Sequence, residues 1–140
     1  KGYKSALEKN NIVFNEELVF TSSLMENDGK LNVQKMMNLP YKIDGLFCAN
    51  DVVAIGAIKY LKEINIKIPE DIAIVGFSNE SISSVIEPAL STINQPGLEI
   101  GVAATELLIA KITNEGEKLK NETIIIKTSL IERKSSLRSS

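Results

Sequence analysis

The sequence contains no histidine, no tryptophan and only one cysteine among its 140 residues. Without histidine there is no Ser-His or Cys-His catalytic pair, and a zinc site loses one of its commonest ligands. The single cysteine, Cys48, excludes an intramolecular disulfide framework and fits a reducing cytoplasm. Cys48 lies in a short apolar run, so we interpret it as a buried thiol; a nucleophile would need an activating base.

Strong charge of one sign and long apolar runs are also missing. Sixteen Lys and Arg residues stand against 18 Asp and Glu residues, a net charge of −2, which gives no bulk attraction to nucleic-acid phosphates. No apolar run approaches the ~20 residues of a membrane helix, so we expect no membrane partner. Neither glycine-rich phosphate motif is present, and we expect no cofactor and no metal. The start lacks a signal region and an initiator Met, which indicates a piece of a longer chain.

The segment from residue 43 to residue 77 predicts a strand, a helix and a second strand. Residues 46–49 form an apolar run with the length of a strand buried on both faces. Asn50-Asp51 can cap a helix start, and Pro69 follows the helical pattern before residues 72–75, the second apolar run. Two such strands joined by a helix form a right-handed βαβ unit. Ligands of parallel sheets bind beyond the carboxyl ends of the strands, so function is expected after Cys48 and after Val75.

The rest of the chain continues this alternation and predicts an α/β doubly wound parallel sheet. We expect further helices and strands in this order: a helix ending near 10–11, a strand at 18–20, helices at 30–39 and 82–86, an extended segment at 90–93, a helix at 96–113 and a strand at 123–131. Residues 132–140 are predicted to be frayed.

Four segments resemble the effector-binding core of LacI/GalR-family bacterial transcription regulators. They are Cys48-Ala49-Asn50-Asp51 with the helix that follows, Ile68-Pro69-Glu70-Asp71-Ile72 running on to Gly76-Phe77, Pro88-Ala89-Leu90-Ser91-Thr92-Ile93-Asn94-Gln95-Pro96, and Leu130-Ile131-Glu132-Arg133-Lys134-Ser135-Ser136. The resemblance spans nearly the whole chain in the right order. It implies a periplasmic-binding-protein-like type I fold, of which this chain is mainly the C-terminal lobe.

The family's layout implies domain boundaries. Residues 1–93 would belong to the C-terminal lobe of the effector-binding core, and 94–126 to the N-terminal lobe as a helix plus a strand. Residues 127–134 would return as a strand to the C-terminal lobe, and 135–140 would be a flexible tail. A helix-turn-helix headpiece and most of the first lobe would lie outside this sequence.

The resemblance also implies an effector cleft lined by Asn50, Ser78, Leu24, Gln95 and Glu80. The amide of Asn50 can donate to and accept from a sugar hydroxyl, and the alternative is a plain helix cap. Ser78 stands where many sugar-responding members carry an aspartate, and Glu80 is a candidate to supply a carboxylate instead. Leu24 replaces an aromatic that often stacks on the ligand; it is alternatively a packing residue of its loop. Gln95 either contacts the ligand or holds the strand end.

Four apolar residues fall on the two helices that form the core dimer interface in the family: Ile55, Ile82, Val85 and Ile86. The alternative is that they only cover the sheet. Asp51 is interpreted as a cap or structural residue.

The function implied is a cytoplasmic ligand-sensing domain of a regulator and not an enzyme. Its partners would be a sugar or related metabolite as effector, a second copy in a homodimer, and operator DNA read by the missing headpiece. The alternative is a periplasmic sugar-binding receptor of a transporter, which shares the Ala-Asn-Asp motif.

Overall fold

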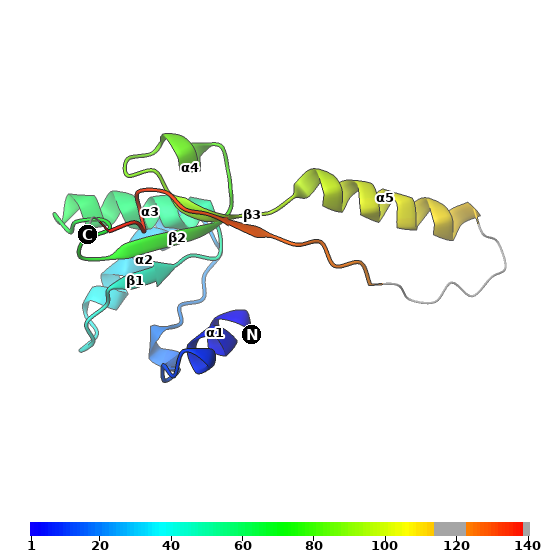
Figure 1. The fold of residues 1–140 in the computed structure, drawn as a ribbon. Helices are drawn as coiled ribbons and strands as arrows, with labels where there is room; N and C mark the ends of the chain where they lie inside the picture. The colour runs from blue at the N-terminus through cyan, green and yellow to red at the C-terminus, as the bar shows by residue number, and fades with distance from the viewer. Residues whose placement is uncertain (114–122, 139–140) are drawn as a thin grey trace.

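A single four-stranded sheet organises the chain, as a computed structural model describing residues 1–113 and 123–138 shows (Figure 1). The strands are β1 (Gly45–Phe47), β2 (Ala73–Ser78), β3 (Ser91–Asn94) and β4 (Ser129–Ile131). They lie in the order β1-β2-β3-β4; the first three are parallel, and β4 is antiparallel to β3. The predicted α/β class with a mostly parallel sheet is therefore confirmed.

Helices alternate with these strands along the chain. They are α1 (Gly2–Lys9), the 3₁₀ turn η1 (Glu16–Leu18), α2 (Glu26–Met37), α3 (Asp51–Glu63), α4 (Ile82–Val85) and α5 (Gly97–Thr113). Helix α3 connects β1 to β2 and packs on β2, which is the βαβ unit that the sequence predicted. Among the residues that the structure describes, no helix is long and apolar enough to cross a membrane.

Helices α2 and α3 cross at very short range because glycine stands at both contact points. A Cβ atom on Gly29 would collide with the carbonyl oxygen of Val53, and one on Gly56 would collide with the carbonyl of Glu26. At the surface beside the crossing, Lys59 Nζ lies 2.6 Å from Glu26 Oε1. The two glycines thus decide how closely the helices approach.

The hydrophobic core lies between this helix pair and the sheet. Ile58 and Leu61 of α3, Ile74 of β2 and Leu90 before β3 are fully buried, and Val33 of α2 joins them. Burying a large aliphatic side chain stabilises the folded chain by roughly 1.5–3 kcal/mol. The core therefore joins α3 firmly to β2, whose carboxyl end carries the candidate site.

Two strands that the sequence predicted are absent or shorter. Residues 18–20 form the end of η1 and an irregular segment, where the Asn15 side chain accepts a hydrogen bond from Glu17 N. The predicted strand at 123–131 is reduced to β4, and Ile125 is 85% exposed. Apolar β-branched residues form a strand only where another strand pairs with them, and neither residues 18–20 nor the described residues 123–128 have such a neighbour.

Helix α5 extends away from the sheet after β3, and none of its residues is buried (Figure 1). Such an apolar helix normally packs an apolar face on a partner layer. The sequence assigned residues 94–126 to a different lobe from residues 1–93, and that assignment stays a prediction. Residues 114–122 of that range lie outside the described part of the chain.

The segment after β4 is ordered against the sheet, which differs from the expected flexible tail at 135–140. Ser135 is fully buried. Its Oγ donates to the carbonyl of Ile74 at 2.6 Å and accepts from Ser91 N at 2.8 Å. Arg138 donates to the carbonyl of Pro69 at 3.0 Å. Small hydroxyl side chains that bond to strand backbone hold this segment in place; residues 139–140 lie outside the described residues.

Candidate functional site

The carboxyl ends of β1, β2 and β3 meet at one edge of the sheet, and the side chain of Asp51 joins them. Asp51 Oδ2 accepts a 2.8 Å hydrogen bond from Glu80 N, in the loop after β2. Asp51 Oδ1 accepts a 2.6 Å bond from Thr92 Oγ1, in β3. The two loop tips that the sequence selected, after Cys48 and after Val75, therefore lie side by side. We call this region the carboxyl edge.

Asp51 itself is fully buried, in agreement with a structural role. Its carboxylate lies so close to β2 that a Cβ atom on Gly76 would collide with Asp51 Oδ1. Gly76 is therefore required for space beside the carboxylate. A buried carboxylate is costly unless donors surround it, and the two hydrogen bonds described above supply them.

Asn50 forms the N-cap of α3 and also holds the loop before α2. Its Oδ1 accepts from Val53 N at 2.8 Å, and its Nδ2 donates to the carbonyl oxygen of Leu24 at 3.0 Å. The cap interpretation is thus confirmed. An amide group has a second N–H and a further lone pair, so Asn50 keeps one donor and one acceptor for a ligand. Ligand contact by Asn50 stays a prediction.

Leu24 lies in the loop that Asn50 holds. Its backbone is left-handed, with φ of 63°, and its side chain is 43% exposed. Leucine rarely adopts this conformation. The hydrogen bond from Asn50 to the Leu24 carbonyl stabilises it, and so places the Leu24 side chain at the border of the carboxyl edge.

The loop of residues 78–80 follows β2 and has an unusual backbone. Ser78 and Asn79 have φ values of 111° and 55°. Glu80 is exposed, and Ser78 pairs in register with Asn94 at the end of β3. Gln95, one residue further, is also exposed. Ser78, Glu80 and Gln95 therefore all lie at the carboxyl edge with Asn50; a ligand touching them remains to be tested.

Asn79 and Arg133 also belong to this edge, and sequence reasoning missed both roles. Asn79 Nδ2 donates to Asn94 Oδ1 at 3.0 Å, and Arg133 Nη2 donates to Asn79 Oδ1 at 2.9 Å. The signal for Asn79 was available, since asparagine after a strand tolerates left-handed backbone better than most residues. For Arg133 no local signal exists, because it is 54 residues from Asn79.

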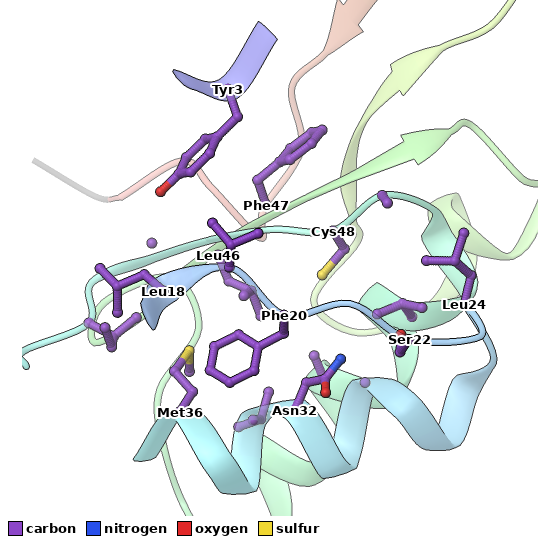
Figure 2. A pocket seen from close by; sticks show the side chains of 18 residues that line it. Tyr3, Leu18, Phe20, Ser22, Leu24, Asn32, Met36, Leu46, Phe47 and Cys48 are labelled. Atoms are coloured by element: carbon purple, nitrogen blue, oxygen red, sulfur yellow. The ribbon is translucent and has the colours of Figure 1, made fainter. Parts of the chain in front are cut away.

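A cavity of about 290 Å³ lies beside the carboxyl edge, between residues 18–24, α2 and β1 (Figure 2). Its lining is mainly apolar and includes Leu18, Phe20, Leu24, Met36, Leu46 and Phe47. Only a few polar side chains, such as Ser22 and Asn32, reach it (Figure 2). A sugar needs converging hydrogen-bond partners. The cavity therefore suits an apolar group, and of the predicted ligand residues only Leu24 lines it.

Cys48 lies in the wall of this cavity, but its chemistry is that of a core thiol. Burial, reinforced by the negative charge of Asp51, raises the pKa of Cys48 to about 12 from 9.0. Since only the thiolate is a good nucleophile, Cys48 is inert at neutral pH. Within the described ranges, no cluster of His, Cys, Asp and Glu is arranged to hold a metal ion.

The four residues predicted for a dimer interface differ in exposure. Ile55 is 6% exposed, so it is already covered within one protomer. Ile86 is half-buried and packs against the core. Ile82 and Val85 of α4 are 45% and 74% exposed. Of the four residues, only Ile82 and Val85 present exposed apolar surface, and the interface itself stays a prediction.

Comparison with known proteins places this geometry in a family. Residues 1–136 match the periplasmic binding protein-like domain. The HTH-type transcriptional regulator MalR of Clostridium butyricum is 35% identical over 134 residues, which are 96% of this chain and 39% of MalR. The chain therefore spans about two fifths of that relative.

Solved structures agree. The transcriptional regulator CelR in complex with cellobiose has a TM-score of 0.89 at 26% identity, covering 96% of this chain and 41% of CelR. A LacI family transcriptional regulator from Enterococcus faecium with bound ribose has a TM-score of 0.83 at 27% identity, covering 96% and 49%. The chain therefore belongs to the periplasmic binding protein-like domain family, in the form that LacI-type transcriptional regulators carry.

Proposed function

We propose that this chain is part of the ligand-sensing domain of a LacI/GalR-type transcriptional regulator. The observation that carries the proposal is the pair of hydrogen bonds that Asp51 accepts from Glu80 and Thr92, which holds the ends of three parallel strands at one edge. Ligands of open α/β sheets bind beyond this edge. Asn50, Ser78 and Glu80 then form one wall of an effector cleft.

The effector we propose is a sugar or a related small metabolite. Asn50 offers an amide, Ser78 a hydroxyl and Glu80 an exposed carboxylate, and all three groups exchange hydrogen bonds with hydroxyl groups. Gln95 borders the same wall from the β3 side, and Leu24 offers an apolar contact for one face of a ring. CelR with cellobiose and the Enterococcus faecium regulator with ribose support this ligand class.

The full protein would act in the cytoplasm, without catalysis, as a homodimer that binds operator DNA through a headpiece outside this sequence. An effector that binds one conformation better than another shifts the population between them. By linkage, DNA binding must then change effector affinity by the same factor. The net charge of −2 makes this chain itself a poor partner for DNA.

The test uses the full gene product with ribose and cellobiose as probes. Under the proposal, at least one sugar raises its melting temperature and changes its retention of the promoter fragment of its own operon in a gel-shift assay. No DNA binding with or without the sugars would contradict the regulator. A secretion signal in the gene, with sugar binding intact, would favour the periplasmic receptor instead.

For the dimer, Val85 provides a sharper test than the buried Ile55. Val85→Glu places a charge on a side chain that is 74% exposed, so folding is unaffected. The full gene product should then sediment as a monomer. Ser84→Glu, on the same short helix, is the matched control and should leave the dimer intact. A dimer that persists in Val85→Glu would rule out α4 as the interface.

A further inference from the structure

The 78–80 loop is held in an unfavourable backbone conformation by side chains from three other parts of the chain. Ser78 and Asn79 both have left-handed φ values. Such residues persist only where their surroundings hold them. Asn79 N donates to Thr92 Oγ1 at 3.2 Å and Glu80 N donates to Asp51 Oδ2 at 2.8 Å. These bonds fix the loop backbone, while a further set fixes the Asn79 side chain.

The side chain of Asn79 is held at both ends of its amide. Its Oδ1 accepts from Arg133 Nη2 at 2.9 Å, and its Nδ2 donates to Asn94 Oδ1 at 3.0 Å. Asn94 is the last residue of β3, where the chain leaves the sheet for α5. Arg133 lies two residues beyond the end of β4, beside Ser91 at the start of β3. One amide therefore joins the carboxyl end of β3, where the chain leaves for α5, to the segment that follows β4.

Arg133 is itself rigidly placed. Its Nη1 donates to the carbonyl of Leu90 at 2.7 Å and to Ser83 Oγ at 3.0 Å. Its backbone N donates to Ser91 Oγ at 2.7 Å. A guanidinium group has donors in a fixed planar fork, so the contacts to Leu90 and Ser83 orient the nitrogen that reaches Asn79.

We propose that Asn79 couples the geometry of the 78–80 loop to the carboxyl end of β3 and to the segment after β4, with Arg133 as its positioning residue. If β3 and β4 slide relative to one another, the distance between Asn94 and Arg133 changes and the Asn79 amide loses one of its two partners. The left-handed backbone then relaxes, and Ser78 and Glu80 change position. The relevance of this coupling to an effector rests on the proposed function; the coupling itself does not.

The test is amide hydrogen exchange on the full gene product without ligand. In Arg133→Lys the charge remains but the fork is lost, because an ammonium group cannot reach all three oxygens at once. The amides of Asn79 and Glu80 should exchange at least about tenfold faster, while α3 keeps its protection. Loop amides that exchange at the wild-type rate would overturn the proposal.

Arg138→Lys is the matched control. Arg138 also donates to backbone carbonyls, of Pro69 at 3.0 Å and of Asp44 at 2.9 Å, but far along the sheet from the loop. It should leave the exchange of Asn79 and Glu80 unchanged. Equal effects from both variants would show a general loss of stability and contradict a specific role of Arg133.

Two further variants separate coupling from simple loss of a contact. Asn94→Ala should also speed exchange in the loop. In the double variant with Arg133→Lys, exchange should be no faster than in the faster of the two single variants, because both substitutions act through the Asn79 amide. Asn79→Asp can still accept from Arg133 but cannot donate to Asn94. In that background Asn94→Ala should have no further effect; a full effect there would overturn the role of Asn79.

These outcomes are independent of ligand identity. If the exchange pattern is found while ribose and cellobiose fail to bind the full gene product, the coupling stands and the proposed ligand class fails. If the sugars bind and Arg133→Lys leaves the loop amides unchanged, the coupling fails and the proposed function stands.

Discussion

Thr92 and Asp51 are 41 residues apart in the sequence, yet Thr92 Oγ1 donates a 2.6 Å hydrogen bond to Asp51 Oδ1 in the buried interior. The bond joins β3 to the start of α3. Because β2 lies between them, Gly76 must lack a side chain for the contact to form. The buried Asp51 carboxylate thus holds the wall of the proposed cleft in position without itself having to contact a ligand.

Removing this carboxylate should destabilise the chain. Asp51→Ala leaves the Thr92 hydroxyl and the Glu80 amide without their acceptor, and unpaired buried donors cost about 2–4 kcal/mol in total. Urea unfolding followed by circular dichroism should show that loss. Asp44→Ala removes an exposed carboxylate and should change stability by no more than about 0.5 kcal/mol. Equal midpoints for the two variants would contradict the role of Asp51.

Two substitutions of Asn50 separate its cap from its other contacts. Asn50→Ala should lower the free energy of unfolding by about 1 kcal/mol, the usual cost of losing an N-cap. Asn50→Ser keeps a cap acceptor but loses the amide that donates to the Leu24 carbonyl. In the full gene product, we expect both variants to weaken the response to the sugar that binds the wild type. A normal response in Asn50→Ser would show that the residue is only a cap.

The helix crossing predicts a contrast between two glycines. Gly56→Ala should lower the free energy of unfolding by about 1–3 kcal/mol, because its Cβ would press on the Glu26 carbonyl and separate α2 from α3. Gly101→Ala, in the exposed α5 with no atom within 4 Å of the added Cβ, should be neutral or stabilising. Thermal unfolding of both variants decides this, and a neutral Gly56→Ala would mean that the helices can move apart freely.

Cys48 predicts a loss of stability at high pH. Its pKa is about 12 in the folded chain and 9.0 when unperturbed, so the unfolded state releases the proton first as pH rises. The stabilisation that the buried Cys48 thiol gives the folded chain is complete below pH 9 and is lost progressively between pH 9 and 12. Cys48→Ala removes it, so the difference in unfolding free energy between wild type and variant should shrink over that range. A constant difference would show that the thiol is exposed to solvent.

Much of the fold was predictable because its signals are local. The apolar run before Asn50 and the helical spacing after it indicated the βαβ unit, and the pair Asn50-Asp51 marked the start of α3. Topology then predicted that the tips after Cys48 and Val75 would meet, since parallel strands end at one edge. The LacI-type resemblance rested on the same segments and is confirmed by the comparisons.

Other features depend on which segments become neighbours. Residues 18–20 and 124–126 have the composition of strands, but a strand needs another strand to pair with. Ser135 looked like part of a polar tail, yet it bonds to two strands and is fully buried. The cavity beside β1 was likewise not indicated by any local pattern, because its lining comes from several separate segments.

The sequence by itself determined the alternation of helices and strands, the cap of α3 and the edge of the sheet where a ligand would bind, because periodicity and capping act over a few residues. Only the tertiary structure decided that Asp51 is buried and that Asn79 lies between Asn94 and Arg133. Those contacts join residues 15 to 54 positions apart, and a hydrogen bond over such a separation exists only once the sheet has brought its strands together.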